Sequence, residues 1–229
     1  MAQQTIFEQL APYAGLTVVP GVTVGKLNYA NQMDIFSDSL FTVTGSTVAA
    51  NTELPFFTTA LTETGQGWST GMTLGQTNSK FSKGQPPANQ CFVARTMSFG
   101  AYITSSDNPA NAQAITLLSV QDLFALVQNF SWDLQIGRGI TRTIGSLLEY
   151  PDAGGAWSVQ RTAANAGAQN GVPACHTVIL PVPIIFPPLV NVGITARSGN
   201  SFKLLDINGG EAKVVVRATL GGYLMTMPV

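Results

Sequence analysis

Residues 90–103 read QCFVARTMSFGAYI, and residues 212–225 read AKVVVRATLGGYLM. Both stretches are rich in β-branched and aromatic side chains, which are enriched in β-strands. Similar clusters recur along the chain between segments that contain its 23 glycines and 13 prolines. This is the pattern of many short strands separated by turns, so the sequence predicts an all-β protein.

Nine segments fit this strand pattern. They are residues 16–19, 36–44, 54–61, 90–103, 131–136, 141–148, 176–182, 189–196 and 212–225. Strands in this number favour a single β-sandwich or barrel, and 229 residues are enough for one such domain. We expect an N-terminal arm over residues 1–20 and one domain over residues 21–229.

One segment departs from the strand pattern. Ser119 and Asp122 form a start that resembles a capping box. Apolar residues follow at helical spacing, namely Leu117, Val120, Leu123, Phe124, Val127 and Phe130. The sequence predicts a short helix over about residues 120–129 that closes one end of the domain by burying Leu123, Phe124 and Val127.

Charged residues are scarce. Only 10% of the chain is Asp, Glu, Lys or Arg, and the net charge is −1, whereas soluble domains usually carry about a quarter of charged residues. The basic residues are scattered, so no footprint for nucleic acid or an anionic membrane is visible. A neutral surface of this kind favours repeated contacts between identical copies.

The motifs that could carry catalysis lack their context. Gly67-Trp68-Ser69-Thr70-Gly71 matches the Gly-x-Ser-x-Gly pattern, but neither an apolar strand precedes it nor a periodic helix follows it. His176 is the single histidine, and Cys175 beside it would point to the opposite face of a strand. We therefore predict that the chain is not an enzyme and that His176 is a packing residue.

Cofactor and metal patterns are also missing. Zinc usually takes four Cys or His ligands, and the chain has only Cys91, Cys175 and His176. No EF-hand or P-loop spacing is present, so no cofactor is predicted, while an ion site made by the fold or by a subunit interface stays open. Both cysteines are predicted to be reduced core residues.

Targeting signals are not visible either. The start MAQQTIFEQLAP has no cationic region followed by an apolar one. The apolar stretch 178–190 is interrupted by four prolines and is too short to span a bilayer. We expect synthesis in a cytoplasm.

Three short stretches resemble a known family. TLGQTN (73–78) with GQPPANQCFV (84–93) is similar to a signature of structural proteins of bacterial viruses. WDLQIG (132–137) with YPDAGG (150–155) is similar to a short strand and turn of that family, with Asp152 inserted. LPVPIIFPP (180–188) with the closing segment 214–228 is similar to its last strands. Ser79, where the family has Met, and the segment around Met227, where it has Arg, depart from the pattern.

The resemblance implies a single jelly-roll capsid protein of an icosahedral bacteriophage, located in the virion and without catalytic residues. Its partners would be identical subunits, as a trimer or another cyclic capsomer, and other virion proteins. Strong nucleic-acid binding is not expected, and whether the shell lies against an internal membrane stays open. Two alternatives are a decoration or spike protein of the virion and a carbohydrate-binding jelly roll, the latter suggested by Trp68, Trp132 and Trp157 near turns.

We expect contacts between subunits from the arm, from the loops 62–87 and 151–173, and from a proline-rich strand at a sheet edge. In the arm, four apolar residues share one face at helical spacing. The contact candidates are Ile6, Phe7, Leu10, Tyr13, Trp68, Trp157, Pro183 and Pro187.

Overall fold

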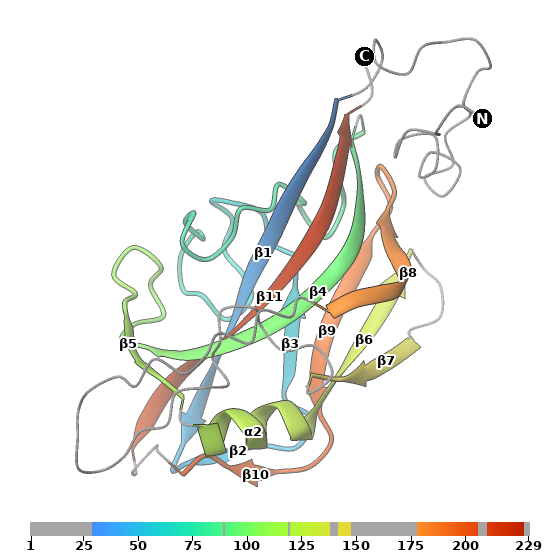
Figure 1. Cartoon of the computed structure of the whole chain (residues 1–229). Helices are drawn as coiled ribbons and strands as arrows, with labels where there is room; N and C mark the ends of the chain where they lie inside the picture. Colours follow the sequence, from blue (N-terminus) through green and yellow to red (C-terminus); the bar gives the residue numbers. More distant parts are fainter. Residues whose placement is uncertain are drawn as a thin grey trace, which may run out of the picture.

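The computed structural model describes residues 29–88, 90–118, 120–137, 142–147, 178–205 and 210–226. These residues form two antiparallel sheets that pack face to face, with one helix at one end (Figure 1). The prediction of an all-β protein is therefore confirmed. No helix in the described part is long and apolar enough to cross a membrane.

The larger sheet has seven strands in the order β10-β2-β1-β11-β4-β5, and β8 also pairs with β4. Its strands are β1 (Tyr29–Thr44), β2 (Thr47–Val48), β4 (Gln90–Thr104), β5 (Ala114–Leu117), β8 (Val178–Phe186), β10 (Phe202–Lys203) and β11 (Glu211–Thr226). The long strands β1, β11 and β4 lie side by side along the molecule (Figure 1). These three strands form the centre of the larger sheet, and its shorter strands lie on either side of them.

The smaller sheet has four strands in the order β3-β9-β6-β7. Its strands are β3 (Glu53–Phe56), β6 (Phe130–Ile136), β7 (Arg142–Ser146) and β9 (Val192–Ser198). Burial alternates along β9, which is the pattern of a strand with one face on a core. The smaller sheet covers one face of the larger one.

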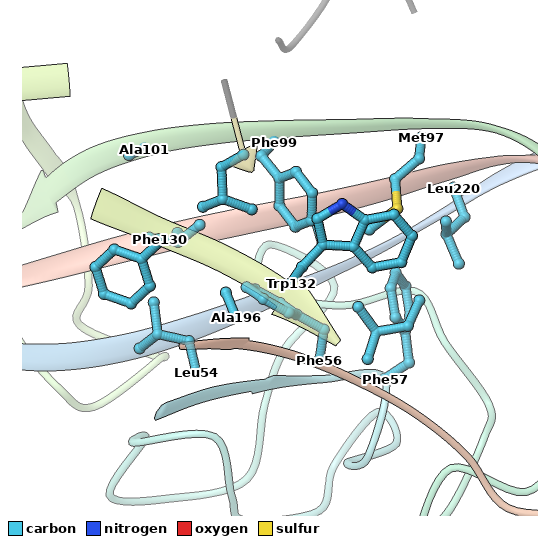
Figure 2. Close-up of a cluster of buried hydrophobic side chains, with 14 of the residues drawn as sticks. Leu54, Phe56, Phe57, Met97, Phe99, Ala101, Phe130, Trp132, Ala196 and Leu220 are labelled. Carbon is cyan, nitrogen blue, oxygen red and sulfur yellow. The ribbon is translucent and has the colours of Figure 1, made fainter. Parts of the chain in front are cut away.

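The core between the sheets is rich in aromatic rings. Trp132 of β6 is fully buried, and its ring lies 6.3 Å from that of Phe99 on β4. Phe56 of β3 packs against the same Phe99 at 5.7 Å. Figure 2 shows these rings between the ribbons of the two sheets. Ring pairs at such distances stabilise the fold beyond the contribution of the apolar area that they remove from water.

The helix α2 spans Val120–Asn129, as predicted. Its buried residues differ from those expected, because Leu126 and Val127 are buried whereas Phe124 is 46% exposed. The side chain of Leu123 lies outside the described residues. The helix runs directly into β6 at Phe130, and its buried face is centred on Asp122 and Leu126, so Phe124 lies toward the opposite side.

β1 begins at Tyr29 instead of residue 36, and two other strand boundaries differ from the prediction where the backbone turns. β3 ends at Phe56 instead of residue 61, because Phe57 has a positive φ of 58° that an extended strand does not allow. β9 begins at Val192 instead of residue 189, because Leu189 has a φ of 58° in the turn after β8. β8 continues beyond residue 182 to Phe186, and β2, β5 and β10 were not predicted. The predicted strand 16–19 lies outside the described residues.

Replacing Phe99 with alanine tests this core. We expect the free energy of unfolding to fall by about 3–5 kcal/mol, the usual cost of truncating a buried phenylalanine. Urea denaturation followed by tryptophan fluorescence measures the change. Leu205→Ala, at an exposed position, is the control and should change stability by less than about 0.5 kcal/mol. Equal effects of the two substitutions would contradict the packing described.

Candidate functional site

The long segment between β3 and β4, residues 57–88, lies along the free edge of β1 (Figure 1). It contains no helix and no strand longer than an isolated bridge. Backbone amides of β1 donate to it, from Asp38 to the Gln76 carbonyl at 2.9 Å and from Leu40 to the Gln66 carbonyl at 2.8 Å. The segment therefore satisfies edge groups of β1 that have no neighbouring strand here.

The same segment also packs on the outer face of the larger sheet, away from the core. Trp68 and Met72 of the segment are buried against Leu40 of β1 and Val215 of β11. The indole Nε1 of Trp68 donates to the Asp38 carbonyl at 3.4 Å. A satellite cluster of this kind holds a long loop in one position.

A buried ion pair lies beside this cluster. Asp38 on β1 is paired in register with Arg217 on β11, and the carboxylate is fully buried. Arg217 donates to it twice, from Nε to Oδ1 at 2.7 Å and from Nη2 to Oδ2 at 2.9 Å. Tyr102 on β4 donates its hydroxyl to Oδ2 at 2.7 Å. Three adjacent strands thus share one carboxylate.

The ion pair extends to the segment that covers it. Arg217 Nη2 also donates to the carbonyl of Gly75, and its guanidinium lies 4.6 Å from the ring centre of Phe36. Gln66, which is buried, donates from Nε2 to the Asp38 carbonyl at 2.7 Å and to Ser37 Oγ at 2.6 Å. Its Oε1 accepts from the Thr59 amide at 3.1 Å. Side chains of the sheet and the segment therefore form one hydrogen-bonded network.

The pKa values in this network follow from burial. Burial raises the pKa of Asp38, and the guanidinium of Arg217 and the hydroxyl of Tyr102 oppose that rise. Burial and the charge of Asp38 together raise the pKa of Tyr102, which stays protonated and remains a donor. Both oxygens of the Asp38 carboxylate accept hydrogen bonds, from Arg217 and from Tyr102. The carboxylate therefore connects β1, β11 and β4.

The Gly-x-Ser-x-Gly segment lies in this covering loop. Ser69 is exposed, and its Oγ donates to the backbone carbonyl of Asp107 at 3.2 Å. Residues 57–66 before it and 72–88 after it contain neither a strand nor a helix, so the strand-turn-helix setting of a nucleophile elbow is not present in this part of the chain. Across the described ranges, no three His, Cys, Asp or Glu side chains come together as metal ligands.

Trp68 is placed differently from its prediction. Its side chain is only 3% exposed and packs within the chain, so we withdraw it as a contact residue between subunits. Trp132 is fully buried in the core. Neither ring is available for stacking on a sugar. The loop 62–87, expected to contact neighbours, uses its large buried side chains to cover the chain's own sheet.

Pro183 and Pro187 are half-buried at β8 and just after it. β8 pairs only with β4 among the described strands, and its register slips around residues 180–183, which include Pro181 and Pro183. This is the edge setting in which prolines occur in sheets. The other predicted positions, Ile6, Phe7, Leu10, Tyr13, Trp157, Cys175 and His176, lie outside the described residues.

The Asp38–Arg217 pair was not found in the sequence, although a signal for it exists. Arg217 lies inside the largely apolar stretch 214–225, and Asp38 lies in the predicted strand 36–44, in a chain that has very few charges. Buried charges are almost always paired, so a charge inside an apolar strand indicates an oppositely charged partner on a neighbouring strand. What the sequence does not give is the register that places them opposite each other.

Comparison of the chain with protein-family models, with curated proteins and with solved structures finds no match.

Replacing Arg217 with leucine tests the ion pair. The change leaves the buried Asp38 carboxylate without its cation, so we expect the free energy of unfolding to fall by about 3 kcal/mol. This value is at the lower end of the usual cost of breaking a buried ion pair, because the side chain of Arg217 is 32% exposed. Adding Asp38→Leu should restore part of the loss, since no unpaired charge remains. Urea denaturation measures both, and a double variant less stable than Arg217→Leu would argue against this account.

A pair of glycine substitutions tests the docking of the covering segment. Gly67 has a φ of +86°, and a Cβ there would lie 2.0 Å from the carbonyl oxygen of Leu40. Gly67→Ala should displace the segment and raise the rate of limited proteolysis within residues 57–88 at least tenfold. Gly199→Ala is the matched control, because a Cβ there meets nothing within 4 Å. Similar cleavage of the two variants would show that the segment is not held at this point.

Alkaline pH should weaken the fold in two steps. Burial raises the pKa of Cys91 from 9.0 to about 11, so the unfolded chain loses this proton first and the free energy of unfolding falls between these values. Tyr102 adds a further fall above pH 10, its ordinary pKa. Urea midpoints between pH 8 and 11 measure the slope. Cys91→Ala should remove the first step and Tyr102→Phe the second, and an unchanged slope in both variants would contradict the assignment.

Proposed function

We propose that the chain is a virion structural protein, a jelly-roll capsid protein that assembles as cyclic oligomers into an icosahedral bacteriophage shell. The observation that carries the proposal is the order of the strands. Four strands of the larger sheet follow as β1-β11-β4-β8, and the facing sheet follows as β3-β9-β6-β7. Eight strands distributed in this way over two facing sheets are the arrangement expected of a jelly roll.

A jelly roll serves several functions, including capsid, lectin and cupin roles. A sugar site that uses Trp68 or Trp132 is disfavoured, because both rings are buried. A metal site of the cupin type lacks a group of ligands in the described residues. The low charge of the chain and its resemblance to phage structural proteins favour the capsid role.

The covering segment supports the same role. A segment of this length without strands or helices would usually be mobile, but here a buried ion pair, Gln66 and an apolar cluster fix it to the sheet. Fixed, neutral surfaces suit repeated contacts, since ordering them on assembly costs little conformational entropy. The segment thus offers a rigid outer surface with few charges.

Exposed apolar side chains indicate where such contacts form. Ile179 on β8 is 70% exposed, and Leu189 in the turn after β8 is 62% exposed. They flank Pro183 and Pro187 on the same edge strand and the turn that follows it. Leu189 also holds a positive φ that is unfavourable for a leucine. We assign this rim, residues 178–190, as the contact edge between subunits.

The oligomeric state tests the proposal. Light scattering coupled to size-exclusion chromatography, followed by electron microscopy of concentrated fractions, should show a trimer or another cyclic oligomer that forms closed shells. A strict monomer at high concentration would refute it. Oligomers that never close by themselves but bind to a preformed shell would instead identify a decoration protein.

Charged substitutions on the rim locate the contact. Ile179→Asp and Leu189→Asp should each weaken association at least tenfold, because about 1.4 kcal/mol corresponds to a factor of ten and burying one aliphatic side chain contributes about 1.5–3 kcal/mol. Analytical ultracentrifugation over a dilution series measures this. Ser201→Asp, at an exposed position after β9, is the control. If all three variants associate equally, the rim is not the contact between subunits.

A further inference from the structure

The outer face of the larger sheet has a second apolar cluster, separate from the one under residues 57–88. Cys91 and Val93 of β4 and Met225 of β11 are buried there, and Ile185 and Tyr223 pack against them partly buried. We call these five side chains the upper cluster. Their registers agree, since Cys91 pairs with Met225 and Val93 pairs with both Tyr223 and Ile185.

The upper cluster points away from the core. Its neighbours in sequence, Phe92, Phe186 and Leu224, belong to the core between the sheets, and successive residues of a strand face opposite sides. Among the described residues, the upper cluster is made only of side chains from β4, β8 and β11. The covering segment 57–88 supplies Trp68 and Met72 to the other cluster instead.

The start of β1 lies next to the upper cluster. Tyr29 pairs with Thr226, and Thr226 pairs with Gln90, the neighbour of Cys91. Two strand spacings, about 10 Å, therefore separate the point where residue 28 joins the sheet from the cluster. Twenty-eight residues preceding Tyr29 can span up to about 90 Å when extended, so reach is no constraint.

The residues before Tyr29 also have a suitable composition. Apolar side chains recur in residues 1–19, and Glu8 and Lys26 are the only charged residues before Tyr29. The other long segment outside the described residues, 148–177, is rich in Ala, Gly, Asn and Gln. It joins β8 at Val178, opposite Met97, several residues along β4 from Cys91. Position and composition both favour the N-terminal segment.

We infer that the upper cluster is the docking site for residues 1–28 of the same chain, with Ile6, Phe7 and Leu10 as the side chains that cover it. The inference is independent of the proposed capsid function, because it concerns one chain.

Cys91 itself reports on this docking. In a Cys175→Ser background, Cys91 is the single thiol of the chain, and alkylation by N-ethylmaleimide is followed by mass spectrometry. The triple substitution Ile6→Ser, Phe7→Ser and Leu10→Ser should raise the alkylation rate at least tenfold. The matched control, Trp157→Ser with Val159→Ser, should leave the rate unchanged. An unchanged rate in the N-terminal variant, or an increase in the control instead, would overturn the inference.

A cross-link keeps the test independent of folding defects. Phe7→Cys in the Cys175→Ser background, oxidised with copper phenanthroline in air, should form a disulfide with Cys91. The cross-linked product should migrate as a monomer on a non-reducing gel at all protein concentrations. A cross-linked dimer would show that the segment comes from a second copy. The absence of a cross-link from Phe7→Cys, and from Ile6→Cys and Leu10→Cys made in the same background, would show that the site is not used. Either result contradicts docking within one chain.

Discussion

The central strands of the larger sheet are covered on both faces over part of their length, and much of the molecule's arrangement follows from this constraint. Val214, Val215 and Val216 are consecutive residues of β11, and all three are fully buried. Two of them face the core, while Val215 faces the covering segment. A strand covered on both sides has no face left for polar residues, so residues 214–216 form a continuous apolar run. The smaller sheet covers one side and residues 57–88 cover part of the other.

A covering loop must satisfy its own backbone as well as bury side chains. Here the backbone amides of Asp38 and Leu40 donate to the carbonyls of Gln76 and Gln66, and the carbonyl of Phe36 accepts from the hydroxyl of Thr77. The Asp38–Arg217 pair then joins the sheet to the loop at Gly75. Because Asp38 is fully buried and Arg217 also donates to Gly75 of the loop, the loop and the ion pair stabilise each other. This coupling gives a long irregular segment one defined position.

The sequence predicted the elements where the local pattern was strong. The strands at residues 90–103 and 212–225 and the helix at 120–129 appear within one or two residues of the prediction. It failed at Phe57 and Leu189, where an apolar residue takes a positive φ. Such residues look like strand residues in the sequence, and only the packing around them selects the turn. The prediction for Phe124 failed because the buried face of the helix is centred on Asp122 and Leu126, which places Phe124 toward the opposite side.

By itself, the sequence determined the all-β class, the positions of the long strands and the low charge of the surface, because each depends on composition or on short-range periodicity. The tertiary structure alone decided that Asp38 faces Arg217, that Trp68 is buried, and that Cys91 lies on the outer face beside the start of β1. These relations depend on the register of strands that are far apart in sequence. Register is fixed by which faces are buried together, and no local pattern in the chain records that choice.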